Sequence, residues 1–319
     1  MEDLEDMVVC GNYAAIDIGS NAVRLLIKRI DKNEDGLFCS KEQIIRVPLR
    51  LGFEVFTSGT IPIDKADDLI RLMISYDNIM NIYKVVDYKI CATSAIRDAS
   101  NGKEIIDEIR ERTGLHVDVL SGDEEALLIF KNHAECIQDR QGNFMYVDVG
   151  GGSTEVIMLV NGAMVFSASY NIGTIRILHD TDEDKEWDRM RLEMQTLSNK
   201  YGSIDIIGSG GNINKLYKIV SEKDKKFRRI RVKALAEIHS QMENMSVEER
   251  IKMFKLRYDR ADVIVPAAAI FLNISKAVKS TYIYVPTIGL VDGMIDELFI
   301  SKMDEIQHQI SSSADQTEV

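Results

Sequence analysis

The sequence predicts an α/β protein made of two similar halves with a cleft between them. Apolar strands alternate with amphipathic helices along the chain, which is typical of a mostly parallel or mixed sheet covered by helices. The stretch NFMYVDVG at residues 143–150 repeats the design of NYAAIDIG at residues 12–19, so that Asp148 aligns with Asp17. The length of 319 residues also exceeds what one hydrophobic core usually spans. Together these observations indicate a duplicated fold.

The first half begins with two strands between Tyr13 and Ile30, joined at a Gly-Ser-Asn turn, and a third strand is expected around Gln43 to Leu51. Residues 61–85 carry apolar side chains at helical spacing, which predicts a long helix. A short strand and a loop are expected at residues 87–97, then a helix at 102–114 that Gly114 closes. A strand, a tight turn and a helix are expected at residues 117–137.

The second half begins with the repeated strand motif and continues with a strand near Ala163 to Tyr170. A long helix is expected from about Glu183 to Tyr201 and a strand at residues 204–208, which leads through a glycine turn into another helix. The remainder is expected to be largely helical, apart from a strand at TYIYVP, and to end with a helix from about Gly289 to Met303.

Composition and charge exclude several classes of protein. The net charge of −12 and the pI near 5.0 argue against sequence-independent binding to nucleic acid. The four cysteines form no CxxC pair, so they predict unpaired thiols in a reducing cytosol and no zinc site. The most apolar segment, residues 261–278, is interrupted by polar residues, and the acidic start MEDLEDM lacks the basic residues of a signal peptide. We therefore expect a cytoplasmic protein with no membrane partner.

Three glycine-rich turns, at Gly19, at residues 150–152 and at residues 208–211, each follow an apolar strand. Glycine allows backbone amides to approach a phosphate closely and to point at it. Further hydroxyl and amide donors stand beside these glycines: Ser20, Asn21, Ser153, Thr154 and Asn212. One such turn alone is most often an ordinary β-turn. Three together, two of them with an acid at the same relative position, favour a phosphate-binding site.

Acidic residues flank the same turns. Asp17, Asp148 and Glu155 would repel a phosphate, so their placement predicts a hard cation such as Mg²⁺ between carboxylate and phosphate oxygens. Arg24 and Arg97 each follow or lie on an adjoining strand and are candidate phosphate clamps, with surface ion pairs as the ordinary alternative.

A base that activates a nucleophile is sought in LSGDEEALLIF, where three acids begin a helix. Acids in a first helical turn ordinarily complement the helix dipole and cap free amides, and Asp123 is expected to do so. Glu124 and Glu125 point in different directions, so one of them is expected to face the cleft. Their spacing does not decide which.

Five motifs in this order, AAIDIGSNAVRLLI, ATSAIRDA, LSGDEEALLIF, YVDVGGGSTEVI and IGSGGNINKL, resemble the exopolyphosphatase and guanosine-pentaphosphate phosphatase (Ppx/GppA) family. The similarity covers about Tyr13 to Phe299. It implies two ribonuclease-H-like domains of the actin, Hsp70 and sugar-kinase (ASKHA) superfamily with an interdomain cleft. Domain I would comprise residues 12–126 and the C-terminal helix at 290–308, and domain II residues 127–289.

The resemblance implies Mg²⁺-dependent release of the terminal phosphate of polyphosphate, or of a guanosine penta- or tetraphosphate. It implies Glu125 as the base that activates water and Asp17, Asp148 and Glu155 as the metal site. A homodimer is compatible with it. The implied phosphate contacts are Ser20, Asn21, Arg24, Arg97, Gly150, Gly151, Gly152, Ser153, Thr154, Gly210, Gly211 and Asn212.

The chain departs from the family pattern in several places. It ends where longer members carry an HD-type helical domain, so it is expected to be the short form. GLVDG at residues 289–293 replaces the common GLREG, which removes an arginine at Val291, and Ala267 stands where glycine is frequent. The basic run from Lys223 to Lys233 is a candidate guide for a phosphate chain, with a solvated helix or loop as the ordinary alternative.

Two other functions share parts of this pattern. A small-molecule kinase of the same superfamily would have the same turns, but no separate sugar motif is present. A catalytically weak protein that binds polyphosphate or a guanosine alarmone is the other alternative. GSGGNI at residue 208 lacks the third glycine of a dinucleotide-binding motif, and no GxxxxGK[ST] motif is present, so a dehydrogenase or a P-loop enzyme is not expected.

Overall fold

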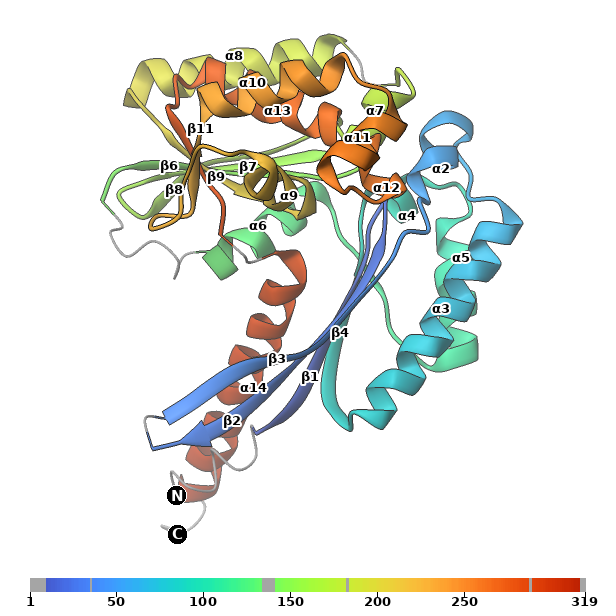
Figure 1. Cartoon of the computed structure of the whole chain (residues 1–319). Helices are drawn as coiled ribbons and strands as arrows, with labels where there is room; N and C mark the ends of the chain where they lie inside the picture. Colours follow the sequence, from blue (N-terminus) through green and yellow to red (C-terminus); the bar gives the residue numbers. More distant parts are fainter. Residues whose placement is uncertain (1–9, 35, 134–140, 182–183, 287–288, 316–319) are drawn as a thin grey trace.

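The computed structural model describes residues 10–34, 36–133, 141–181, 184–286 and 289–315. It has two lobes, each built around one sheet (Figure 1). The first sheet has the strand order β3-β2-β1-β4-β5, with β1 (Gly11–Ile18), β2 (Val23–Asn33), β3 (Gly36–Val47), β4 (Val85–Ala92) and β5 (Asp118–Val119).

The helices of the first lobe cover both faces of its sheet. Helices α3 (Ile63–Ile82) and α5 (Gly102–Thr113) lie on one face, and α14 (Leu290–Asp315) lies on the other, against β1, β2 and β4 (Figure 1). Successive side chains of β1 point to opposite faces, so Ala14 and Ile16 join the core under α3, while Tyr13 and Ala15 join the core under α14. Because β1 is buried on both sides, its middle, Tyr13 to Ile16, is apolar on both faces.

The second sheet has the order β10-β11-β12-β9-β6-β7-β8. Its strands are β6 (Asn143–Val149), β7 (Thr154–Val160), β8 (Ala163–Tyr170), β9 (Asp205–Ser209), β10 (Lys223–Asp224), β11 (Arg229–Arg231) and β12 (Tyr282–Tyr284). One face packs against α8 (Asp184–Tyr201), α9 (Gly211–Ile219), α10 (Val232–Glu243) and α13 (Ile264–Ala277). The other face packs against α6 (Gly122–His133).

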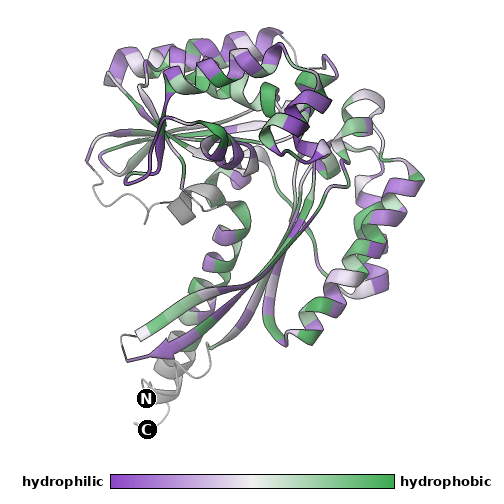
Figure 2. Cartoon of the chain, in the orientation of Figure 1, coloured by the Kyte–Doolittle hydropathy of each residue, from purple (hydrophilic) through white to green (hydrophobic). Residues whose placement is uncertain are grey.

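Five short helices connect these layers, many of them near the junction of the lobes: α2 (Gly52–Ser58), α4 (Ser94–Asp98), α7 (Thr174–Leu178), α11 (Val247–Phe254) and α12 (Tyr258–Ala261). In Figure 2, α3 and α14 alternate between hydrophobic and hydrophilic residues, as amphipathic helices do. Within the described part of the chain, no helix combines the length and the hydropathy that crossing a membrane requires.

The predicted duplication is visible in the strand pairing. β1 pairs antiparallel with β2 and parallel with β4, and β6 likewise pairs antiparallel with β7 and parallel with β9. The register places Asp17 opposite Arg24 in the first hairpin and Asp148 opposite Glu155 in the second. The two-lobed α/β architecture predicted from the sequence is therefore confirmed.

Some element boundaries differ from the prediction. The third strand is Gly36–Val47 rather than residues 43–51. Its middle, residues 40–43, is polar, because much of the strand is exposed, so the sequence lacks the apolar pattern that would have predicted it. The last helix continues to Asp315, and the basic run contains the two short strands β10 and β11. Helix α6 is continuous across the predicted domain boundary at residue 126 and packs on β7 and β8. The expected helix end at residues 134–137 and helix start at residue 183 lie outside the described residues.

Candidate active site

The three glycine-rich turns meet at one cavity of about 230 Å³ between the lobes. They meet there because β1, β6 and β9 all end at this junction. Twelve predicted site residues line it: Asp17, Ser20, Asn21, Arg24, Glu125, Asp148, Gly150, Gly151, Ser153, Gly210, Gly211 and Asn212. Their convergence from both lobes follows from the matching positions of the two hairpins.

Two of the glycines are required by close approach. A Cβ atom on Gly151 would lie 2.8 Å from the Cβ of Ser20, so the loop of the second lobe touches the loop of the first. Gly210 has a φ of +94°, and a Cβ there would lie 2.6 Å from Oδ1 of Asp148. A side chain at either position would push the cavity walls apart or distort the turn. The two glycines therefore let the turns pack closely around the cavity.

Glu125, and not Glu124, faces the cavity. Glu124 is exposed, and its Oε2 accepts hydrogen bonds of 2.8 Å from both the backbone N and the Oγ of Ser121. Together with the bond from Glu124 N to Ser121 Oγ, this is a capping box that closes the first turn of α6. Glu125 is only 8% exposed, and its Oε2 has no hydrogen-bond partner among the described residues.

Burial and mutual repulsion disfavour the charged forms of the acids around the cavity. Burial, followed by the charges of Glu155 and Asp148, raises the pKa of Glu125 well above its ordinary value. Burial raises the pKa of Asp148 to about 6, and burial also raises the pKa of Glu155. A cation bound beside these carboxylates would reduce the cost of their negative charge.

Asp17 is compensated differently, by Arg24. Nη1 of Arg24 lies 2.5 Å from Oδ2 of Asp17, directly across the hairpin, and Asp17 is 3% exposed. Burial raises the pKa of Asp17, and the charge of Arg24 opposes that rise. The two residues, which we expected to serve the metal and the phosphate separately, thus form an ion pair on the cavity wall.

The acid cluster fits a divalent cation that also takes ligands from outside the protein. Glu125 offers an unpaired buried oxygen beside Asp148 and Glu155, and hard cations prefer such oxygen ligands. Among the described residues, no three Asp, Glu, His or Cys side chains are close enough to hold a metal by themselves.

Four predicted site residues do not line the cavity: Arg97, Gly152, Thr154 and Glu155. Thr154 Oγ1 instead donates a 2.6 Å hydrogen bond to the backbone oxygen of Ile172, and Glu155 accepts one of 3.0 Å from Ser169. Thr154 is therefore a buried support of the turn and not a phosphate ligand. Glu155 lies in a small hollow beside Asp148, behind the cavity wall.

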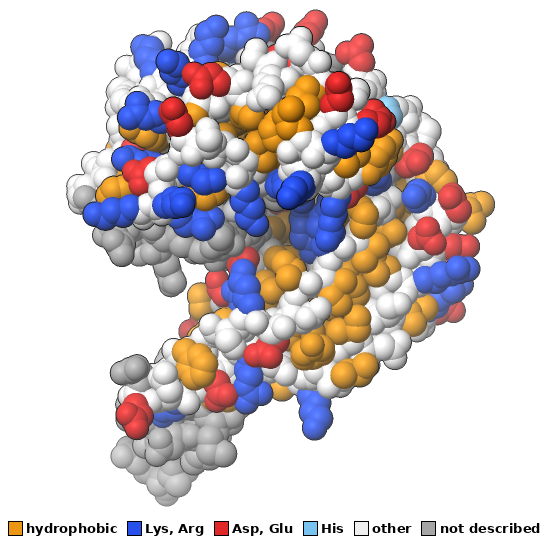
Figure 3. All heavy atoms as spheres, in the orientation of Figure 1, with side chains coloured by type: hydrophobic (Ala, Val, Ile, Leu, Met, Phe, Trp, Pro, Cys, Tyr) orange, Lys and Arg blue, Asp and Glu red, His pale blue; other side chains and the backbone are white. Residues whose placement is uncertain are grey.

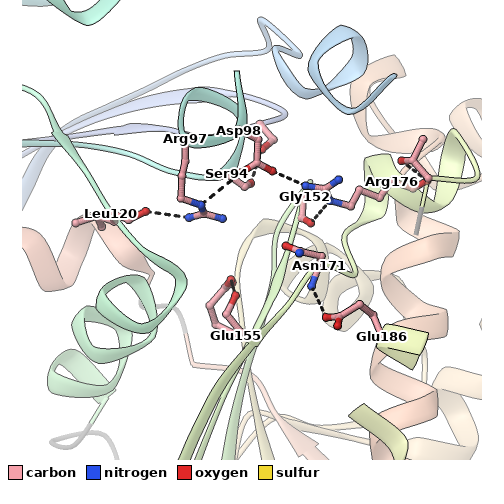
Figure 4. A network of polar contacts seen from close by, with 12 residues as sticks. Ser94, Arg97, Asp98, Leu120, Gly152, Glu155, Asn171, Arg176 and Glu186 are labelled. Carbon is pink, nitrogen blue, oxygen red and sulfur yellow. Dashed lines mark hydrogen bonds and ion pairs between the residues drawn. The ribbon is translucent and has the colours of Figure 1, made fainter. Parts of the chain in front are cut away.

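Arg97 and Gly152 belong to a polar network that joins the lobes behind the glycine turn (Figure 4). Arg97 Nη1 donates a 2.9 Å bond to the backbone oxygen of Leu120, and its Nε lies 3.5 Å from Asp98. Asp98 also pairs with Arg176, whose Nε donates a 2.7 Å bond to the backbone oxygen of Gly152. Burial raises the pKa of Glu155, and the charge of Arg97 partly opposes that rise, so Arg97 lies near the acid cluster although it does not line the cavity.

Sequence reasoning missed several cationic residues of the cavity, above all Lys41, Arg46 and Arg260. Arg46 pairs with Arg24 in the register of β2 and β3 and forms a 2.5 Å ion pair with Asp259. Arg260 donates to the backbone oxygen of Gly211, and burial with nearby Arg46 and Arg24 lowers its pKa to about 10. A correct placement of β3 would have suggested Arg46 as a neighbour of Arg24. Arg260 is not part of any motif that we recognised.

The lining of the cavity thus carries groups of both charges. Arg24, Arg46 and Arg260 are cations, while Asp148 and Glu125 are acids. Such a site can bind phosphate oxygens through its cations and leave a carboxylate free to accept a proton.

Comparison with known proteins identifies this arrangement. The model of the Ppx/GppA phosphatase family matches residues 30–302. This chain belongs to that family. A solved structure of the Aquifex aeolicus family member is 26% identical, with a TM-score of 0.71 over 91% of this chain and 98% of that one. An exopolyphosphatase structure from Cytophaga hutchinsonii, 22% identical, has a TM-score of 0.78 over the same shares and supports the fold.

Two curated relatives of this Ppx/GppA chain illustrate the names that its relatives carry. Exopolyphosphatase 1 of Mycobacterium tuberculosis is 29% identical over 179 residues, which cover 56% of this chain and 51% of that protein. A guanosine-5′-triphosphate,3′-diphosphate pyrophosphatase of Aeromonas salmonicida is 23% identical over 295 residues, or 89% of this chain and 58% of that protein. The chain thus spans about half the length of these relatives. These solved structures confirm the predicted α/β fold, and its assignment to the ASKHA superfamily stays a prediction.

Proposed function

We propose that this protein is a phosphohydrolase that releases the terminal phosphate of inorganic polyphosphate or of guanosine pentaphosphate. The observation that carries the proposal is Glu125, a buried carboxylate with an unpaired oxygen, at a cavity lined by glycine turns and arginines. The names of the relatives support both substrates, because they include an exopolyphosphatase and a guanosine-phosphate pyrophosphatase.

The arginines of the cavity and the glycine turns bind the terminal phosphate. Arg46 and Arg260 are held in place by Asp259 and by the backbone oxygen of Gly211, so their guanidinium groups need little reorganisation when an anion arrives. The amides of Gly19 and Gly150 close their turns on Ala22 and Ser153, so the amides of the next residues, Ser20 and Gly151, are the proposed donors to the same oxygens. Charge that moves onto these oxygens as the bond to the leaving group breaks is thereby stabilised.

Glu125 accepts the proton of the attacking water at its Oε2. A general base must be near the proton that it takes and must have a suitable pKa. Burial and the neighbouring acids raise the pKa of Glu125, which makes its carboxylate a stronger base than an exposed glutamate. Capping by Glu124 anchors the helical turn that carries Glu125, so the base has a defined position.

Asp148, Asp17 and Glu155 would hold Mg²⁺, with oxygens of water and substrate as further ligands. When bound, the cation would neutralise phosphate charge that would otherwise be repelled by these carboxylates. Asp148 lines the cavity itself, while Glu155 stands behind it and Asp17 is paired with Arg24. We therefore propose Asp148 as the principal protein ligand.

Product analysis tests the proposal. Purified protein is incubated with polyphosphates of several lengths and with guanosine pentaphosphate, each with Mg²⁺ and with a chelator. We expect free phosphate in the presence of Mg²⁺ only. ADP together with a phosphorylated acceptor, when ATP and small acceptors are supplied, would instead identify a kinase. Tight binding of these anions without phosphate release would identify a binding protein.

A further inference from the structure

A row of basic residues leads away from the cavity along α9 to the hairpin of β10 and β11. Figure 3 shows Lys and Arg side chains across the front of the upper lobe, at the level of this helix. The row comprises Arg260, Lys215, Lys218, Lys223, Lys226 and Arg228, and we refer to these six residues as the basic track.

The basic track is continuous with the cavity. Helix α9 begins at Gly211, which lines the cavity and accepts a hydrogen bond from Arg260. Burial, together with the charges of Arg260 and Lys218, lowers the pKa of Lys215, so the three cations lie near one another. At the far end of the helix, Nζ of Lys223 donates bonds of 3.1 and 3.0 Å to the backbone oxygens of Tyr217 and Lys218.

Helical spacing puts the cations on the side of α9 that begins in the cavity. Asn212 lines the cavity, and Lys215 and Lys218 follow it at intervals of three residues, so each of these side chains neighbours the previous one along the helix. Helix α9 has nine residues, so it extends about 14 Å from the cavity. This is a rigid support for a series of positive charges.

The charges of the track are not neutralised by acids. Among the described residues, Lys215, Lys218, Lys226 and Arg228 form no ion pair with a carboxylate. The side chain of Lys215 instead donates a hydrogen bond to the backbone oxygen of Lys255, and that of Arg228 donates one to the backbone oxygen of Val285. The acids nearby are Glu222 and Asp224, and Asp224 is engaged by Arg229 at 3.1 Å. In a chain with a net charge of −12, such a row attracts a partner of strongly negative charge.

Aromatic rings hold the outer part of the track in place. Arg228 and Lys223 lie over the ring of Tyr217, at 5.1 and 5.4 Å from its centroid, and Lys226 lies over Phe227 at 5.2 Å. Cation–π contacts of this kind restrict long side chains without removing their charge. The positive groups therefore stay available to a further ligand.

We propose that the basic track binds the part of an extended inorganic polyphosphate chain that projects beyond the cavity. The inference rests on the proposed function, because it assigns the terminal phosphate to the cavity and the preceding phosphates to α9 and the hairpin. A guanosine pentaphosphate carries too few phosphates in a row to reach the hairpin. The track thus favours long polyphosphate over short or nucleotide substrates.

The test uses Lys218→Glu/Lys226→Glu, because both side chains are exposed and neither donates a hydrogen bond to the fold. The matched control is Lys65→Glu/Lys200→Glu, which makes the same change in net charge on α3 and α8, away from the track. For the binding measurements, both double substitutions are combined with Glu125→Gln. For the turnover measurements, they are introduced into the protein with Glu125 unchanged. Thermal unfolding verifies that all variants are folded.

Binding of long-chain polyphosphate is measured by calorimetry at low and at about 1 M salt, where charges are screened beyond about 3 Å. We expect the track variant to bind about tenfold more weakly than the control at low salt, with the difference lost at high salt. In turnover, the ratio of kcat/KM for long-chain polyphosphate to kcat/KM for tripolyphosphate should fall about tenfold in the track variant and stay constant in the control.

The possible failures of the two proposals can be told apart. Equal polyphosphate binding and equal kcat/KM ratios in the track and control variants would overturn the proposed role of the basic track, even if the protein hydrolyses polyphosphate normally. If the track variant binds polyphosphate more weakly than the control but the protein releases no phosphate, the proposed hydrolysis is overturned and the proposed role of the basic track is supported. Binding of single-stranded RNA as tight as that of polyphosphate, with the same loss in the track variant, would overturn the assignment to polyphosphate.

Discussion

Asp17 and Asp148 occupy equivalent positions in the two hairpins and line the same cavity from opposite lobes. They are near enough that the charge of Asp17 raises the pKa of Asp148. Yet their partners differ, because Asp17 faces Arg24 across its hairpin and Asp148 faces Glu155. The duplicated backbone thus carries one neutralised acid and one acid pair in need of a cation, which makes the two halves chemically unequal.

Glu125→Gln and Glu124→Gln separate the base from the cap. Removing the base should lower kcat by about 10² or more with little change in thermal stability, because the amide keeps the shape but accepts no proton. Glu124→Gln should keep kcat within about twofold, since glutamine can also cap Ser121. Phosphate release and thermal unfolding are measured for both. Equal activity of the two variants would remove Glu125 from its role.

The metal-free protein should lose stability as the pH rises from about 4 to about 6. The folded pKa of Asp148, about 6, lies above the ordinary value of 3.8, so the folded state binds more protons than the unfolded state in this interval. The stability that Asp148 contributes is fully present below pH 3.8 and is lost as the pH rises through about 6. Urea unfolding with a chelator, at a series of pH values, measures this change.

Asp148→Asn supplies the control for that pH dependence. The variant should show a flatter profile, because asparagine does not titrate. At pH 7 it should be more stable than the original protein by about 2 kcal/mol. Water that enters the cavity screens the Asp148 charge, which keeps this difference small. Parallel profiles for the two proteins would show that Asp148 does not cause the slope.

Mg²⁺ should stabilise the protein at pH 7. A ligand that binds only the folded state raises its stability by mass action, by about 2.7 kcal/mol at a hundredfold excess over Kd. Thermal unfolding in Mg²⁺ and in chelator should therefore differ for the original protein and much less for Asp148→Asn. An equal shift in both proteins would place the bound cation elsewhere.

Gly151→Ala should disturb the contact between the lobes. The added methyl group would lie 2.8 Å from the Cβ of Ser20, so we expect a loss of about 1–3 kcal/mol in unfolding free energy together with reduced turnover. Gly289→Ala is the matched control, because Gly289 lies at the same cavity and no atom of the described residues lies within 4 Å of an added Cβ. If both variants unfold alike, the loops do not touch in solution.

Much of the site was predictable because its signals are local. Strand periodicity located both hairpins, and the glycines with their neighbouring acids marked the turns that meet at the cavity. The strand β3 was misplaced because an exposed strand carries a polar sequence. Arg97 and Thr154 were assigned to the ligand because a motif shows that a residue is near a turn but not on which side of it.

By itself, the sequence determined the duplicated hairpins, the glycine turns and the pair of candidate glutamates, because each depends on residues a few positions apart. Tertiary structure alone decided that Glu125 is buried against the second lobe while Glu124 caps its helix. It also brought Arg260, from α12 of the second lobe, beside Arg24 and Arg46 of the first. Those choices depend on how two separately folded sheets pack together, which no local pattern of side chains records.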